Sequence, residues 1–146
     1  MNARLFLDTN IIVYAFDLSF PKKSKIARRL ITDGAADKQA IISYQVVHEF
    51  INVALRGFRL AIVKSDLESF VLTALFPMMA ISSSPALTID ALRLHNENQL
   101  AWYDSLIIAA ALQGGCKVLY SEDLQHGRRF GDLVIQNPFL RMPAVE

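Results

Sequence analysis

Short runs of β-forming residues alternate along this chain with longer stretches of helical periodicity, and this alternation limits the folds open to it. We expect strands at residues 4–7, 40–43, 78–81, 117–120 and 133–135. The segments between them space their apolar residues three and four positions apart, as on one face of a helix. Strands alternating with helices are typical of a parallel sheet covered by helices on both faces. The sequence therefore predicts one α/β domain, with no linker or internal repeat.

Local signals place the ends of several helices. Apolar side chains between residues 67 and 75 share one helical face, and Ser65 with Glu68 predicts a capping box just ahead of it. Ser84 followed by Pro85 is typical of a helix start, with serine at the cap and proline in the first turn. Glycine favours helix ends, which we expect at Gly34, at Gly57 and at the pair Gly114 and Gly115.

Composition bounds the class of protein. A chain of 146 residues, 53% of them hydrophobic, supports a single domain over residues 1–146 with a well-formed core. Its mean hydropathy of +0.29 indicates more apolar surface than a monomer needs, so we expect self-association. The single cysteine, Cys116, excludes an internal disulfide and a cysteine-based zinc site and suits a reducing compartment. With no signal-peptide pattern and no apolar run long enough for a bilayer, we expect a cytoplasmic protein without a membrane partner.

Four acidic residues stand where a parallel sheet would gather them. Asp8 directly follows the first expected strand and Asp123 follows the fourth, and sites in such sheets lie beyond the carboxyl ends of the strands. Glu49 borders the apolar face of a helix expected at 44–56, and Asp104 opens an almost wholly apolar helix at 104–112. Each acid also has a purely structural alternative: a helix N-cap for the three aspartates, and a solvent-facing helix flank for Glu49.

Taken together, the four carboxylates could converge on one cleft. Unpaired carboxylates at close range repel one another, which raises their pKa values. A hard divalent cation such as Mg²⁺ or Mn²⁺ removes that conflict, because it prefers carboxylate and water oxygens. The sequence offers no other partner that would serve all four acids.

These motifs resemble those of the PIN domains, and more narrowly the VapC-like toxins of type II toxin–antitoxin pairs. The resemblance covers essentially the whole chain and rests on four motifs in order: Leu5 to Asn10 with Asp8, Ser43 with Glu49, Tyr103 to Ala111 with Asp104, and Leu119 to Asp123. It implies a Rossmann-like, three-layer α/β/α sandwich with a central parallel sheet. It further implies Mg²⁺-dependent endoribonuclease activity, with Mn²⁺ able to substitute, and an antitoxin protein as partner.

If the four acids form one cleft, we expect a distinct role for each. Asp8 and Asp104 would be the main metal ligands, and Asp123 would bind through water or hold a second ion. Glu49 would orient or deprotonate the attacking water, so that hydrolysis leaves a 5′-phosphate and a 3′-hydroxyl. Residues that could hydrogen-bond these carboxylates or a substrate phosphate are Thr9, Asn10, Ser121 and Glu122. Glu122 could also share or replace the role of Asp123.

Basic residues near the expected cleft are candidates for RNA contact. A predicted helix places Lys22, Lys23, Lys25, Arg28 and Arg29 opposite its apolar face, and Arg128 and Arg129 follow the fourth motif. These cations form either a solvated surface or a rim that binds phosphate. The net charge of +1 leaves an excess of five positive charges once the four site acids are set aside. The histidines show no ligand spacing, whereas Trp102 and Tyr103 could stack on a base or pack in the protein.

Two other α/β classes fit the sequence less well. A phosphotransfer receiver would need an acid after the third strand, where this chain has Ser82, Ser83 and Ser84. A haloacid-dehalogenase-type phosphatase would need a second aspartate at the position of Asn10. A catalytically silent PIN-like module that binds RNA or protein stays open as the alternative function. The apolar excess leads us to expect a homodimer surface and a groove for an antitoxin.

Overall fold

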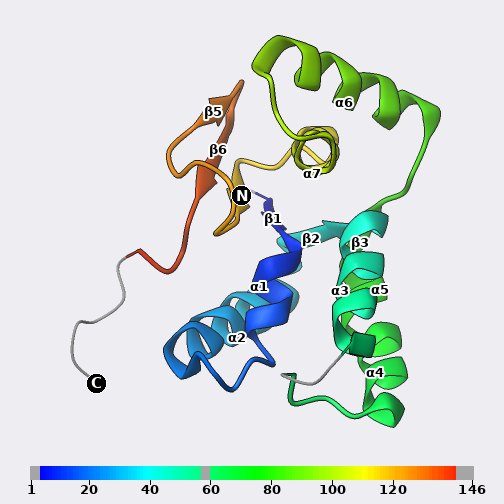
Figure 1. The fold of residues 1–146 in the computed structure, drawn as a ribbon, viewed down its shortest axis with the longest axis vertical. Coiled ribbons are helices and arrows are strands. Elements are labelled where there is room, and N and C mark those ends of the chain that lie inside the picture. Colours follow the sequence, from blue (N-terminus) through cyan, green and yellow to red (C-terminus); the bar gives the residue numbers. More distant parts are fainter. Residues whose placement is uncertain (1–3, 57–59, 141–146) are drawn as a thin grey trace.

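The structure, a computed structural model, describes residues 4–56 and 60–140. Figure 1 shows a central sheet with α7 and α6 on one side and α1 and α2 on the other. In chain order the elements are β1 (Leu5–Leu7), α1 (Thr9–Tyr14), α2 (Pro21–Ala36), β2 (Ala40–Ser43), α3 (Tyr44–Arg56), α4 (Lys64–Phe70), η1 (Val71–Leu75), α5 (Phe76–Met78), β3 (Met79–Ile81), α6 (Pro85–Asn98), α7 (Trp102–Gln113), β4 (Val118–Tyr120), β5 (Arg129–Phe130) and β6 (Leu133–Gln136).

The sheet has the strand order β3-β2-β1-β4-β6-β5. Every neighbouring pair is parallel except β5 and β6, which are antiparallel. The expected α/β architecture, a mostly parallel sheet flanked by helices, is therefore confirmed. Sequence patterning missed β5, because it has only two residues and returns at once through Gly131, whose φ of 58° suits a tight hairpin.

The strand order reverses at β1, and this reversal positions the site. The chain leaves β1 toward β2 and β3 on one side and later adds β4 and β6 on the other. The backbone N–H of Asp8 donates to the carbonyl oxygen of Tyr120 at 3.0 Å, so the carboxyl ends of β1 and β4 lie together. In open α/β sheets the crevice at such a reversal is where ligands bind.

The core explains why these segments take up their places. All four residues of β2 are buried, and α7 buries Ile107 through Ala111 without interruption, which matches its almost wholly apolar sequence. Helix α3 buries Val46, Val47 and Phe50 and leaves Glu49 half-buried at the border of that face. A parallel sheet covered on both faces needs such continuous apolar runs.

Two of the expected helix ends are confirmed. Helix α6 begins after Ser84, whose Oγ accepts a hydrogen bond from the N–H of Leu87 at 3.0 Å, and Pro85 is its first residue. Helix α7 ends at Gln113, just before Gly114. The expected end at Gly57 lies outside the described residues.

Two other expectations about helix ends were wrong. Helix α4 begins at Lys64, so Ser65 lies inside it, and the N–H groups of Asp66 and Leu67 bond to the carbonyl of Val63 instead of a serine cap. Helix α2 continues past Gly34 to Ala36. Gly34 is needed for packing, because a Cβ at this position would lie 2.4 Å from the Cβ of Ala40 in β2.

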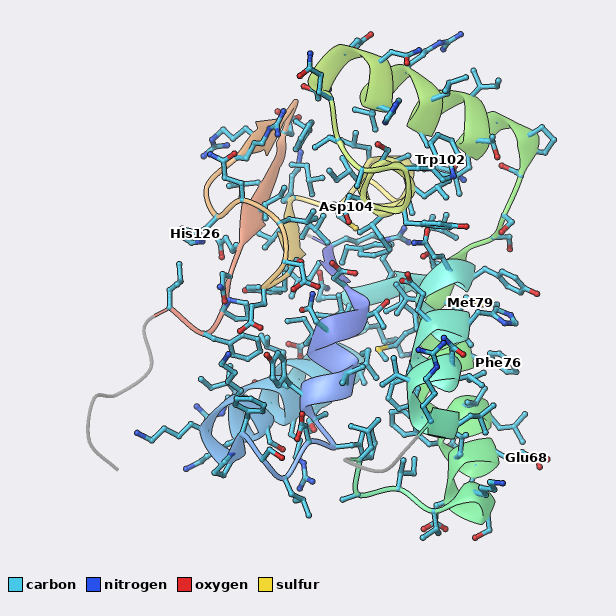
Figure 2. All side chains as sticks on the ribbon, in the orientation of Figure 1. Glu68, Phe76, Met79, Trp102, Asp104 and His126 are labelled. Atoms are coloured by element: carbon cyan, nitrogen blue, oxygen red, sulfur yellow. The ribbon has the colours of Figure 1, made fainter. Side chains whose placement is uncertain are left out.

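Helices α4, η1 and α5 follow one another without a break before β3, with a π-helical segment in the middle. They bury Leu67, Val71 and Leu75, which lie on the apolar face expected from the sequence. Their outer side is open, and Figure 2 shows Glu68 and Phe76 pointing away from the body of the protein. No helix among residues 4–56 and 60–140 is long and apolar enough to cross a bilayer.

Candidate active site

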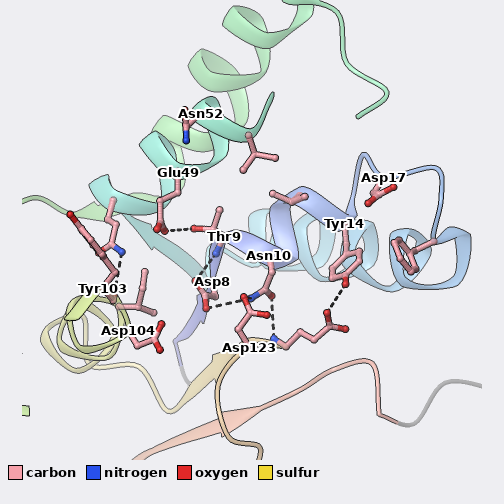
Figure 3. Close-up of a pocket in the computed structure, with 16 residues that line it drawn as sticks. Asp8, Thr9, Asn10, Tyr14, Asp17, Glu49, Asn52, Tyr103, Asp104 and Asp123 are labelled. Carbon is pink, nitrogen blue, oxygen red and sulfur yellow. Dashed lines mark hydrogen bonds between the residues drawn. The ribbon is translucent and has the colours of Figure 1, made fainter. Parts of the chain in front are cut away.

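The four acids singled out from the sequence line one pocket at the carboxyl ends of β1 and β4. Figure 3 shows Asp8 at the end of β1, Glu49 on α3, Asp104 on α7 and Asp123 in the loop after β4. The pocket has a volume of about 530 Å³, which lies in the range of small-molecule and cofactor sites. The tertiary fold thus brings together side chains that are far apart in the chain.

Asp8 is the most enclosed of the four acids, with 8% of its surface exposed. Its Oδ1 accepts a hydrogen bond from the N–H of Thr9 at 2.7 Å, so it caps α1 as the structural alternative expected. Its Oδ2 accepts from the hydroxyl of Ser121, also at 2.7 Å. Burial raises the pKa of Asp8 from 3.8 to about 6; the two hydrogen bonds oppose this rise, and the charges of Glu49 and Asp123 add to it. Capping and a place in the acidic pocket therefore coexist at Asp8.

Asp104 lies in the first turn of α7 and does not open the helix. The helix begins at Trp102, and Ala101 occupies the capping position, so the expected boundary and the capping alternative were both wrong. Among the described residues, no group donates a hydrogen bond to the Asp104 carboxylate. Partial burial raises its pKa, and the charges of Asp123 and Glu49 raise it further. Asp104 is therefore a carboxylate at the pocket wall whose interactions there are repulsive.

Glu49 is held toward the pocket by a single hydroxyl. Thr9 Oγ1 donates a hydrogen bond to Glu49 Oε1 at 2.7 Å, which leaves the second carboxylate oxygen open to other partners. Helix α1 supplies Thr9 and α3 supplies Glu49, so the contact joins the two helices beside β1 (Figure 3). Thr9 therefore positions a pocket carboxylate, a role that its place beside Asp8 suggested.

Asn10 connects the two strand ends that carry acids. Its Nδ2 donates to Asp123 Oδ2 at 3.1 Å and to Ser121 Oγ at 3.3 Å. Its Oδ1 accepts from the backbone N–H of Glu122 at 3.2 Å. Asp123 itself is exposed, and no helix follows it, so the N-cap alternative was wrong for this residue. The side chain of Asn10 thereby sets the position of the loop that carries Asp123.

Glu122 and Asp123 have different environments although they are adjacent. The Glu122 carboxylate forms an ion pair with Lys23 and accepts a hydrogen bond from the hydroxyl of Tyr14. The hydrogen bond to Glu122 raises the pKa of Lys23, and burial together with Glu122 raises that of Tyr14. Asp123 has only the amide of Asn10 as a side-chain partner in the described part of the chain. Glu122 is thus neutralised by its neighbours, and Asp123 keeps an uncompensated charge.

Several pocket residues were missed from the sequence. Helical spacing from the recognised residues could have found most of them, since Tyr14 follows Asn10 by one turn of α1, and Gln45 and Asn52 flank Glu49 on α3. Asp17 lies beyond the end of α1 and has no such signal. Lys23 carries no such signal, because its link to Glu122 depends on how α2 packs. The sequence also gave no reason to prefer Lys23 over its basic neighbours.

The basic residues named as RNA contacts do not line this pocket: Lys22, Lys25, Arg128 and Arg129. The guanidinium of Arg128 donates to Asn98 Oδ1 at 3.2 Å and lies 4.9 Å from the ring centroid of Phe130. Arg129 is exposed in β5 and Lys25 is exposed on α2. Lys23, by contrast, is bonded to a pocket residue. The four named residues therefore lie outside the wall of the pocket.

The donor set of the pocket suits a hard divalent cation. All four acids offer carboxylate oxygens, and the burial and mutual repulsion of Asp8 and Asp104 would be relieved by a positive ion. Within residues 4–56 and 60–140, no three His, Cys, Asp or Glu side chains form a ready-made metal-binding cluster. Mg²⁺ commonly binds one or two carboxylates and keeps several waters, so a closed cage is not required.

Comparison with known proteins places this fold. Similar solved structures include a chain of a toxin–antitoxin complex from Klebsiella pneumoniae, with 20% identity, a TM-score of 0.62 and coverage of 94% of this chain and 98% of that one. The sarcin–ricin loop cleaving toxin VapC20 of Mycobacterium tuberculosis shares 18% identity, with a TM-score of 0.59 and coverage of 82% and 89%. FitAB bound to an IR36 DNA fragment shares 17% identity, with a TM-score of 0.60 and coverage of 92% and 94%.

These likenesses are ones of fold. No curated protein matches this chain in sequence. The family model of the PIN domain matches residues 5–129, which include all four acids of the pocket. The chain therefore belongs to the PIN domain family.

Proposed function

We propose that this protein is a Mg²⁺-dependent endoribonuclease and the toxin of a toxin–antitoxin pair. The observation that carries the proposal is the acidic pocket, in which the buried Asp8 and the unbonded Asp104 share one wall at the strand reversal with two further acids. Membership of the PIN family and the fold shared with the toxin VapC20 support a nuclease. Mn²⁺ should replace Mg²⁺, because both prefer the oxygen ligands that the pocket offers.

Each acid has a distinct part in the proposed reaction. Asp8 and Asp104 would hold the metal, and Asp123 would contribute through water or a second ion. A bound divalent cation would lower the pKa of water and neutralise charge on the phosphate. Glu49, oriented by Thr9, accepts the proton of the attacking water. The water oxygen bonds to phosphorus as the bond from phosphorus to O3′ breaks, and solvent water protonates the departing O3′, which leaves a 5′-phosphate and a 3′-hydroxyl.

Other residues position these groups. Ser121 fixes one oxygen of Asp8, and Asn10 orients Asp123. Glu122 holds Lys23 at the rim of the pocket, where an ammonium group is suited to meet a substrate phosphate. We therefore propose Asp123 for the fourth acidic role, a choice supported by the ion pair that already engages the charge of Glu122.

The test is Mg²⁺-dependent cleavage of cellular RNA by the purified full chain and by Asp104→Asn. We expect the variant to lose cleavage while its circular dichroism and melting temperature stay close to wild type, because Asp104 has no hydrogen bond to lose in the described structure. Asp132→Asn is the matched control, since it removes an exposed aspartate outside the pocket. Unchanged cleavage by Asp104→Asn would refute the site.

A metal titration separates the enzyme from a catalytically silent PIN-like module that binds RNA or protein. Millimolar Mg²⁺ or Mn²⁺ should raise the melting temperature of the wild type, because binding to the folded state alone stabilises it. The same ions should raise the melting temperature of Asp104→Asn by less. A wild type that neither binds nor responds to the metal would favour the silent module.

Two assembly states belong to the same proposal: a homodimer, and a complex with a cognate antitoxin protein. One of the similar structures is named as a toxin–antitoxin complex. Large apolar side chains are exposed on this chain beyond what its core uses, among them Leu55, Val63, Leu72 and Phe76. Light scattering of the purified chain should give a dimer mass, and expression with the neighbouring gene should yield a stable complex that lacks cleavage.

A further inference from the structure

A second cavity adjoins the acidic pocket at the ends of β2 and β3. Its volume is about 180 Å³, and it shares Gln45 and Tyr103 with the first pocket, so the two cavities are neighbours with a common wall. The remaining wall includes Tyr44, the hydroxyls of Ser82 and Ser83, and apolar side chains of α6 and α7. None of the described residues that line it carries a charge. A strongly acidic pocket therefore lies beside a neutral one.

Tyr103 separates the two cavities and has an exposed ring. It directly precedes Asp104 on α7, and 65% of its surface is exposed. Its backbone carbonyl accepts a hydrogen bond from Gln45 Nε2 at 3.3 Å, which ties α7 to α3 at this point. Within residues 4–56 and 60–140, its side chain makes neither a ring contact nor a hydrogen bond. A large ring without a packing partner, at the mouth of a site, is available to a ligand.

A second tyrosine, Tyr44, also lines the neutral cavity. Tyr44 is 44% exposed, and its ring centroid lies 4.2 Å from that of His48, so its orientation is fixed by the neighbouring turn of α3. Ser82 and Ser83 provide hydroxyl groups that both donate and accept hydrogen bonds. A cavity lined by two tyrosines and by small hydroxyl groups matches a flat, polar-edged and uncharged group.

We propose that the neutral cavity binds one base of a single-stranded RNA, stacked on Tyr103, next to the phosphate held over the acidic pocket. The inference rests on the proposed function, since it divides one nucleotide of the substrate between the two cavities. The charged phosphate binds at the acids with their metal, and the uncharged base binds at the tyrosines. Because Tyr103 and Asp104 are consecutive, base and phosphate meet one rigid helix. Paired bases inside a duplex cannot reach such a site, so it selects unpaired RNA.

The test measures binding of a short fluorescein-labelled oligoribonucleotide to the full chain by anisotropy, in the Asp8→Asn background with Mg²⁺ to prevent cleavage. Tyr103→Ala should weaken binding about tenfold, as expected for the loss of one base stacked on an aromatic ring. Tyr103→Phe should bind as well as the parent, because the ring is kept. Phe76→Ala is the matched control, since it removes an exposed ring of α5 that lines neither cavity (Figure 2).

A scan of abasic positions along the oligonucleotide identifies the base concerned. At one position, removing the base should weaken binding of the parent about tenfold and have no further effect in Tyr103→Ala. Equal affinity of the parent and Tyr103→Ala would overturn the proposal. It would also be overturned if, at every position, the loss of affinity from the missing base simply added to the loss from Tyr103→Ala. If the wild type cleaves no RNA yet shows this coupling, the nuclease assignment fails and the base site stands.

Discussion

The buried carboxyl of Asp8 gives the wild type a pH-dependent weakness that Asp8→Asn should remove. Its pKa rises from 3.8 to about 6 on folding, mainly through burial, which corresponds to about 3 kcal/mol. Because the pKa is higher in the folded state, the folded protein binds the proton more tightly than the unfolded chain does. The stability gained in this way is fully present only below the ordinary pKa of 3.8. The contribution is lost as the pH rises toward and through 6. Asparagine does not titrate, so the free energy of unfolding of wild type relative to Asp8→Asn should fall by about 2.5 kcal/mol between pH 4 and pH 8.

The change with pH is the informative quantity, because the substitution also alters hydrogen bonds. In Asp8→Asn the amide oxygen can still accept from Thr9, but an NH₂ group replaces the oxygen that accepts from Ser121 Oγ. That loss lowers the free energy of unfolding of Asp8→Asn by about 1 kcal/mol at every pH, so it does not change how stability depends on pH. At neutral pH without metal, Asp8→Asn should therefore remain more stable than wild type by about 2 kcal/mol.

Urea unfolding in EDTA, followed by the fluorescence of the single tryptophan, measures this difference across the pH range. Asp132→Asn is the control, since its exposed carboxylate pairs with Lys117 at the surface, where such pairs contribute little. Mg²⁺ at neutral pH should return stability to the wild type and much less to Asp8→Asn. A difference between wild type and Asp8→Asn that stays constant from pH 4 to pH 8 would show that burial does not control this carboxyl.

Three further substitutions test other parts of the structure. Glu49→Gln keeps an oxygen for the hydroxyl of Thr9 but cannot accept a proton, so RNA cleavage should fall about 10²- to 10⁴-fold in a single-turnover assay with little change in melting temperature. Gly34→Ala places a Cβ 2.4 Å from that of Ala40, so urea unfolding should show a loss of about 1–3 kcal/mol; unchanged stability would mean that the contact relaxes freely. Arg129→Ala should reduce the slope of RNA affinity against salt by about one if it binds a phosphate, and an unchanged slope would exclude it from the RNA surface.

The acids at the strand ends were predictable from the chain because their positions follow from a local rule. Asp8 comes directly after an apolar strand and Asp123 shortly after another, and parallel strands bring their carboxyl ends to one edge. Which of the two neighbouring carboxylates, Glu122 or Asp123, is paired with other side chains was not predictable. They differ because α2 delivers Lys23, and α1 delivers Tyr14, to one of the two carboxylates.

Helix boundaries are likewise of two kinds, those set by neighbouring residues in the chain and those set by tertiary packing. The start at Ser84 is set by its own hydroxyl and by the proline that follows, so the sequence is sufficient. Gly34 carries the signal of a helix end but lies inside α2, because the sheet approaches the helix at Ala40 and leaves no room for a side chain. Helix α7 likewise begins at Trp102, so Asp104 lies in its first turn and not at the cap expected from the sequence.

The sequence by itself determined the order of strands and helices, the apolar faces and the four acids, because each depends on residues close in the chain. Only the tertiary structure decided which acid is buried, which is paired and which is open. It also placed the neutral cavity beside the acidic pocket, with Tyr103 in the wall of both. Burial and pairing depend on contacts between distant segments, and no local pattern specifies those contacts. The pKa of Asp8 illustrates this: its rise comes mainly from enclosure by the folded chain.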